Sequence, residues 1–111
     1  MSETVDSILK KALESLGHPV SRLFYKGKAR TYITFQLVTG TETDFADDDS
    51  DKTEYIYQVH IYSKDDYIAL IREIKEALKA AGFYNVSFMA ETHEKDTGYY
   101  HIPLEVNYLE V

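Results

Sequence analysis

Residues 54–82 read EYIYQVHIYSKDDYIALIREIKEALKAAG, and the spacing of their apolar side chains changes along the segment. From Glu54 to Tyr62 the pattern alternates, so that every second side chain faces the same side of a predicted β-strand. Beyond Asp66 apolar residues recur every three or four positions, as in an amphipathic helix, and Gly82 ends that pattern. The segment therefore predicts a strand that leads directly into a helix, each with one apolar face.

The rest of the chain supplies partners for this unit. The further predicted elements are a helix from Val5 to Leu16, a short extended piece from Ser21 to Tyr25, and strands over 32–38, 86–92 and 102–108. A turn at 94–98 joins the last two strands as a hairpin. The predicted order is α-β-β-β-α-β-β, and we expect an α+β domain with two helices on one face of a mainly antiparallel sheet of four to five strands.

Two features of the sheet stay open at this level. The crossover through the second helix allows strands 54–62 and 86–92 to be parallel neighbours, or to be separated by another strand. Pro103 lies inside the last predicted strand, and its missing N–H suits a sheet edge or a bulge better than a central position.

Composition limits the possible functions. We expect one domain spanning 1–111, soluble and made in the cytoplasm, because the sequence shows no membrane-spanning apolar run and no leader. Nineteen acidic against twelve basic residues give a net charge of -7, which disfavours a tight grip on nucleic acid. The sequence has no cysteine, so disulfides, thiolate metal sites and cysteine nucleophiles are excluded. Ten tyrosines for this length point to a protein partner.

The segment DFADDDSDKTE at residues 44–54 is the most acidic part of the chain. It does not fit a calcium-binding EF-hand loop begun at Asp47, because Lys52 takes the glycine position and Gln58 the position of the bidentate glutamate. We predict a mobile, mutually repelling loop at about 40–53 that docks onto a partner. Its candidate docking residues are Asp44, Phe45, Asp47, Asp48, Asp49 and Asp51.

The sheet side opposite the predicted helices is a second candidate interface. A single-layer sheet with helices on one face leaves the other face to be covered by a partner or by water, and a second copy of the chain is an economical cover. The candidate residues on this surface and on the last hairpin are Tyr32, Tyr62, Asp96, Thr97, Gly98, Tyr99, Tyr100 and His101, with Thr34 and Met89 nearby.

Catalytic candidates are few. His60 and His101 fall on the polar sides of their strands, so they could meet across the sheet and, with a carboxylate such as Glu105, form a general-base pair or a metal site. The alternative is a pair of hydrogen-bonded sheet histidines. The sequence contains no HExxH, GxSxG, P-loop or GxGxxG motif. We therefore predict a protein that is not an enzyme and binds no metal or cofactor.

The segments KARTYITFQLV (28–38), YIYQVHIYSKDDY (55–67), AAGF (80–83) and EKDTGYYHIPLEVNYLEV (94–111) together resemble the tail-completion proteins of long-tailed phages and prophages. These are also called tail terminator or head-tail joining proteins. The resemblance runs over almost the whole chain, and its most telling pieces are QVHIYSK at 58–64 and DTGYYH at 96–101.

The resemblance implies a non-enzymatic subunit that forms a ring, commonly a hexamer, where the tail tube ends and the head connector begins. Its expected partners are other copies of itself, the tail tube protein and head connector proteins. DNA would only pass through the lumen, and no membrane is involved. The expected location is the host cytoplasm during assembly and then the head-tail junction of the virion. The alternative from another class is an acidic DNA mimic or inhibitory protein that binds a host enzyme.

Overall fold

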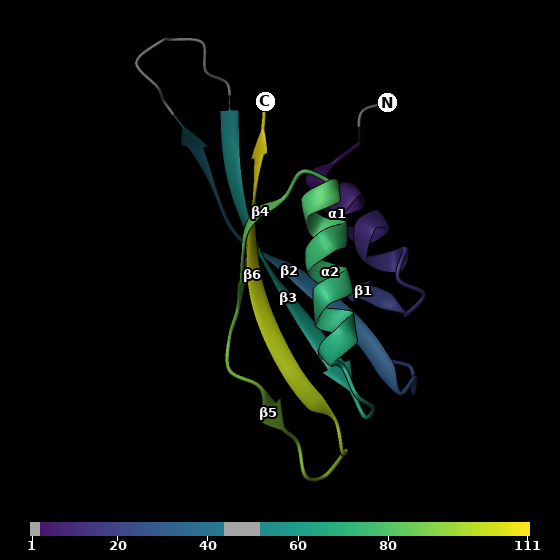
Figure 1. Cartoon of the computed structure of the whole chain (residues 1–111). Helices are drawn as coiled ribbons and strands as arrows, with labels where there is room; N and C mark the ends of the chain where they lie inside the picture. Colours follow the sequence, from purple (N-terminus) through teal and green to yellow (C-terminus); the bar gives the residue numbers. More distant parts are fainter. Residues whose placement is uncertain (1–2, 44–51) are drawn as a thin grey trace.

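The computed structural model describes residues 3–43 and 52–111. Within these ranges the chain forms two helices and one six-stranded sheet (Figure 1). In chain order the elements are α1 (Val5–Glu14), β1 (Val20–Arg22), β2 (Thr31–Thr43), β3 (Lys52–Ser63), α2 (Ile68–Ala80), β4 (Tyr84–Phe88), β5 (Thr92–His93) and β6 (Tyr100–Glu110). The strand order across the sheet is β1-β2-β3-β6-β4, and β5 also pairs with β6.

The predicted α+β class and the order of the longer elements are confirmed. The sheet is mixed rather than purely antiparallel, because β1 runs parallel to β2 whereas the other pairs are antiparallel. The crossover through α2 places β3 and β4 on either side of β6, so of the two arrangements left open above, the separated one is correct.

Both helices lie where their sequences predict, although α1 ends at Glu14, two residues before the predicted end at Leu16. The Thr4 hydroxyl accepts a hydrogen bond from the Ser7 N–H at 3.1 Å, and the Asp66 carboxylate accepts one from the Ile68 N–H at 3.1 Å. Gly17 and Gly82 follow the two helices with φ of 87° and 100°, a backbone conformation that side chains disfavour. Neither helix of the described chain is long and apolar enough to span a membrane.

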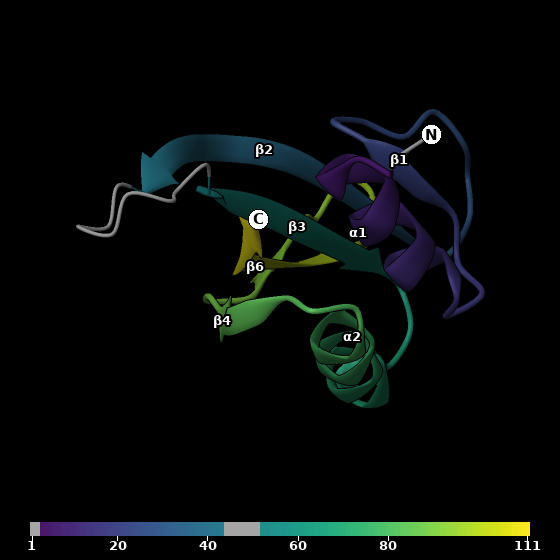
Figure 2. The same cartoon turned by 90° about the horizontal axis from the view of Figure 1, so that it is seen from above.

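The core lies between the helices and one face of the sheet, and both helices lie on that same face (Figure 2). Its fully buried side chains come from each layer and include Leu9 and Leu13 of α1, Ile74 and Leu78 of α2, and Ile33, Phe35, Val59, Ile61 and Leu104 of the sheet. The alternation read from the sequence thus assigns the core face correctly in the three long strands.

The two strands that flank the acidic segment are longer than predicted. β2 continues to Thr43 and β3 begins at Lys52, so the outer parts of the predicted loop at 40–53 are paired strand. The alternation is interrupted by a bulge between Leu37 and Thr39, and an apolar pattern cannot reveal the paired Thr and Glu residues beyond it. The Tyr55 ring covers Gly40 there, 3.2 Å from the position that a Cβ would take.

The last hairpin is interrupted, and Pro103 explains where. β4 ends at Phe88 and β5 begins at Thr92, so the predicted strand over 86–92 is in fact two short strands. The Pro103 carbonyl accepts a hydrogen bond from the Met89 N–H at 2.9 Å, which shows that the proline's missing N–H also faces this interruption. β6 is therefore an internal strand that accommodates a proline beside a gap in its neighbour.

The packing of α2 leads to a first prediction. Ile74→Ala should lower the free energy of unfolding by about 2–5 kcal/mol, because Ile74 is fully buried and its removal leaves a cavity. Ile68→Ala in the same helix is the matched control, since Ile68 is 60% exposed, and it should change stability by no more than about 0.5 kcal/mol. Urea unfolding followed by circular dichroism measures both, and equal losses would contradict the assignment of the core face.

Candidate functional site: an aromatic face of the sheet

The face of the sheet that turns away from α1 and α2 carries aromatic side chains because its strands alternate. Ile33 and Phe35 of β2 are buried on the helix side, which leaves Tyr32 on the other side. The same logic places Tyr62 of β3 beside Tyr32, since the two residues are directly paired across the strands. Tyr62 is in turn paired with His101 of β6. One row of the ladder thus brings three aromatic rings together.

These rings stack in a continuous series, here called the aromatic ladder, formed by Tyr25, Tyr32, Tyr62, His101 and His60. The ring centroids lie 4.3 Å apart for Tyr25 and Tyr32, and 4.7 Å apart for Tyr32 and Tyr62. The ring centroids of Tyr62 and His101 are 4.5 Å apart, and the two ring planes are nearly parallel, with 2° between them. His101 and His60 follow at 4.9 Å. Because the rings stack on one another, the series turns mostly ring edges and hydroxyls outward.

Tyr99 packs edge-on against the side of the ladder. Its ring meets Tyr32 edge-on at 5.3 Å, and its hydroxyl donates a hydrogen bond to the Ala29 carbonyl at 2.6 Å. The Lys64 ammonium lies 4.8 Å from the centroid of the same ring, a cation–π contact. Tyr99 therefore ties the turn before β6 to the loop between β1 and β2, and both flank the ladder.

The two histidines at the end of the ladder meet, as the sequence allowed. His60 Nδ1 and His101 Nε2 are 2.7 Å apart, and His60 Nε2 lies 3.0 Å from the side-chain oxygen of Gln58. Burial, and then the charge of His101, lower the pKa of His60. Burial also lowers the pKa of His101, against an opposing influence of Glu94. Both rings are thus held neutral in the physiological range and hydrogen-bond to each other.

A metal or general-base site does not emerge from this pair. Glu105 pairs with Gln58 and lies four residues beyond His101 along β6. Among residues 3–43 and 52–111, no group of three His, Cys, Asp or Glu side chains could hold a metal ion. His60 and His101 are instead a pair of hydrogen-bonded sheet histidines, which is the alternative given in the sequence analysis.

Two tyrosines of the ladder, Tyr32 and Tyr62, keep their protons at neutral pH. Burial, followed by the neighbouring Tyr62 and Tyr99, raises the pKa of Tyr32 to about 12. Burial and the charge of Glu94 raise the pKa of Tyr62 as well. Their hydroxyls are therefore neutral hydrogen-bond donors, suited to recognition rather than to proton transfer.

The structure brings some of the predicted residues together and separates others. Tyr32, Tyr62, Tyr99 and His101 form one cluster. Tyr100, the further candidate on the last hairpin, lies on the helix side: it pairs with the buried Ser63, and its ring lies 5.6 Å from that of Tyr67. Tyr100 follows Tyr99 in sequence, so strand alternation sends the two rings to opposite sides.

The remaining predicted residues lie beside the ladder or outside the described chain. Thr97 and Gly98 form the turn before β6: the Thr97 hydroxyl donates to the Glu94 carboxylate at 2.8 Å, and the Gly98 N–H to the Glu94 carbonyl at 2.8 Å. Asp96 is exposed in the same turn. The acidic docking residues Asp44, Phe45, Asp47, Asp48, Asp49 and Asp51 lie outside the described residues, so their role stays a prediction.

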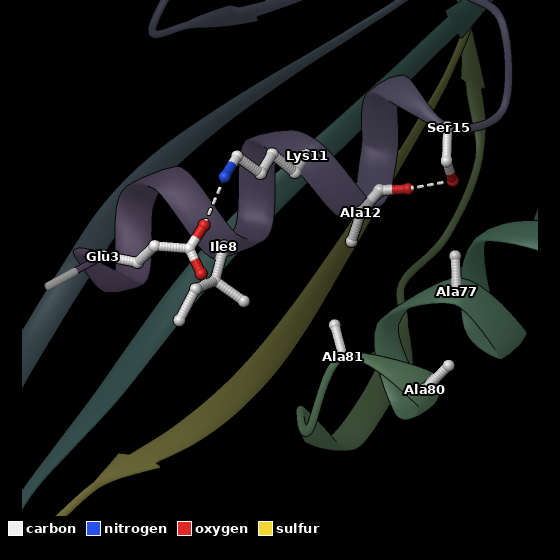
Figure 3. A pocket seen from close by; sticks show the side chains of 8 residues that line it. All are labelled: Glu3, Ile8, Lys11, Ala12, Ser15, Ala77, Ala80 and Ala81. Atoms are coloured by element: carbon white, nitrogen blue, oxygen red, sulfur yellow. Dashed lines mark hydrogen bonds and ion pairs between the residues drawn. The ribbon is translucent and has the colours of Figure 1, made fainter.

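The hollow between the two helices is a different kind of surface (Figure 3). It has a volume of about 400 Å³ and is lined mainly by small side chains, among them Ala12, Ala77, Ala80 and Ala81. Its polar lining consists of the Glu3–Lys11 ion pair and Ser15, whose hydroxyl donates to the Ala12 carbonyl at 2.7 Å. These groups satisfy one another and do not form a nucleophile and base.

Comparison with known proteins adds little to this geometry. No protein-family model matches the chain, and no curated protein matches it either. Among solved structures, the chain is similar to one from a particle described as "Virion of native gene transfer agent (GTA) particle". The TM-score is 0.46 and the sequence identity 14%, over 93% of this chain and 84% of that chain.

The paired histidines predict a dependence of stability on pH. Unfolded histidine has a pKa of about 6.5, so as the pH falls below that value the unfolded chain binds more protons than the folded chain. The free energy of unfolding should therefore fall on acidification through this range. In His60→Gln/His101→Gln this part of the pH dependence should be lost, as measured by urea unfolding at about pH 7.5 and about pH 5.5.

His18→Gln is the control for this experiment, because His18 lies in the connection between α1 and β1 and not in the ladder. It should keep the parent's pH dependence. An unchanged slope in the double variant would show that the two ring contacts do not control the acid response.

Proposed function

We propose that this chain is a non-enzymatic assembly subunit of a phage-type virion, acting at the head-tail junction as a ring that terminates the tail tube and docks it to the head connector. The observation that carries the proposal is the aromatic ladder on the sheet face opposite the helices. The resemblance of the sequence to tail-completion proteins supports the same role. The self-paired histidines and neutral tyrosines supply no group poised for catalysis.

A protein partner fits the ladder better than a small ligand or a nucleic acid. Bases stack on exposed ring faces, whereas here each inner ring already has its faces against neighbours. The net charge of -7 opposes a phosphate backbone in addition. Tyrosine edges with hydroxyls combine apolar area with hydrogen-bond donors, which is the composition of protein interfaces.

The ladder is also well prepared for binding. Stacked and edge-on aromatic pairs each stabilise by about 0.5–1.5 kcal/mol beyond their burial, and Tyr99 holds the series from the side. Rings that are already fixed lose little conformational entropy when a partner covers them. A rigid surface of this kind suits a subunit that has to add to a tube end in one defined orientation.

The test is to remove ladder rings while keeping strand propensity. Tyr32→Thr/Tyr62→Thr should stay folded by circular dichroism, because threonine is a good strand former and both positions are only half-buried, outside the core. It should no longer cap tail tubes viewed by negative-stain electron microscopy, because the ladder is the surface proposed to dock onto the tube end. The expected loss of binding is at least about tenfold, since two central interface tyrosines are removed.

Tyr100→Thr is the matched control, because Tyr100 is 37% exposed but lies on the helix side. It should form rings and cap tubes like the parent protein. A ladder variant that caps tubes normally, or a parent protein that ignores tubes and connectors at high concentration, would refute the proposed function.

A further inference from the structure

The first edge of the sheet, at β1, is basic and partly apolar. Residues 15–41 contain Arg22, Lys26, Lys28 and Arg30 and no aspartate or glutamate. Arg22 and Arg30 are neutralised by Asp6 at 3.3 Å and by Asp65 at 2.9 Å. Among the described residues Lys26 and Lys28 form no ion pair. Leu23 and Phe24, which follow β1 directly, are 55% and 62% exposed.

The opposite edge, at β4 and β5, has the complementary character. Residues 84–96 contain three carboxylates, Glu91, Glu94 and Asp96, against the single cation Lys95. Glu91 and Glu94 each accept one hydrogen bond from a hydroxyl of this chain and keep further acceptor capacity. Met89, in the interval between β4 and β5, is 38% exposed.

The two edges are level with each other along the direction of the strands. One row of paired residues runs Arg22, Phe35, Val59, Leu104 and Phe88, from β1 to the end of β4. A second row runs Thr31, Ser63, Tyr100 and His93, so the end of the basic loop and the start of the acidic turn are also level. Two copies placed side by side, with no shift along the strand direction, would therefore bring these edges together.

We propose that the β1 edge of one copy binds the β4–β5 edge of the next copy, in a head-to-tail contact that repeats around the ring. The inference rests on the proposed function only for the existence of a ring, and it adds the surfaces that join the copies. Within the described chain β1 pairs with β2 alone and β4 with β6 alone, so each edge has backbone groups available for strand addition. Opposite charge fixes which edge meets which.

Charge complementarity favours this occupant over DNA or over a two-fold contact. Two of the four basic side chains at the β1 edge are already paired, and the whole chain is acidic, so a phosphate backbone would be held weakly. Two β1 edges facing each other would bring like charges together. Only the pairing of unlike edges places Lys26 and Lys28 near carboxylates.

The test uses two charge-reversed proteins. In the first, Lys26→Glu/Lys28→Glu makes both edges acidic. In the second, Glu91→Lys/Glu94→Lys makes both edges basic. Each protein alone should stay monomeric by sedimentation velocity and native mass spectrometry, whereas an equimolar mixture should assemble, because every contact in an alternating ring is then between unlike edges. Reversing both edges in one chain should also restore assembly.

Glu73→Lys and Lys75→Glu are matched controls on the exposed side of α2, and both should assemble like the parent protein. If the parent assembles and the two reversed proteins also assemble alone, the edge contact is overturned while the proposed ring stands. If the parent forms no ring even on tail tubes, both proposals fail. If the first variant loses binding to a short DNA duplex but assembles normally, the basic edge is a nucleic-acid surface and the edge contact is overturned.

A covalent test is independent of charge, and the chain has no cysteine of its own to interfere. A copy carrying Phe24→Cys mixed with a copy carrying Met89→Cys should form a disulfide-linked dimer under mild oxidation. Each variant alone should remain largely unlinked. Dimers of the Phe24→Cys variant alone would show a two-fold contact and overturn the head-to-tail arrangement.

Discussion

The rest of the structure depends on the register of β3 between β2 and β6. Because side chains alternate along a strand, a shift of one residue would move Val59 and Ile61 out of the core and turn His60 and Tyr62 into it. The burial of apolar side chains under α1 and α2 makes that shift costly. The same constraint that builds the core therefore also aligns the aromatic face, and the ladder is as well fixed as the core behind it.

The ladder needs more than alternation to form. Tyr32, Tyr62 and His101 are placed by strand pairing, but Tyr25 reaches the stack from the loop after β1, where its hydroxyl accepts the Ala29 N–H at 3.2 Å. At the start of β2 the Arg30 guanidinium pairs with Asp65, and the buried Ser63 hydroxyl lies 2.9 Å from that of Thr31. These contacts hold the loop, the end of β3 and the start of α2 together beside the rings.

Sequence periodicity predicted what local alternation controls and missed what long-range geometry controls. The helices, the core face and the meeting of His60 with His101 follow from periods of 3.6 and 2. Tyr25 was missed because its position depends on the parallel pairing of a three-residue strand, for which the sequence has no distinct signal. The apolar alternation of the last strand begins only at Ile102, so it could not place Tyr100. It also could not reveal that the strand over 86–92 is split opposite Pro103.

The parallel strand β1 also makes the two edges of the sheet different from each other. If β2 were the edge, the sheet would end in a strand with one charged residue, Glu42, and the loop with Lys26 and Lys28 would not lie along that border. With β1 in place, the two edges differ in charge. The ladder runs across the sheet in the same direction, from Tyr25 near β1 to His101 on β6. In the side-by-side arrangement proposed above, successive ladders would follow one another around the ring. Such a surface turns the same ring edges and hydroxyls toward the next component from every copy, which is what docking onto a symmetric tube end requires.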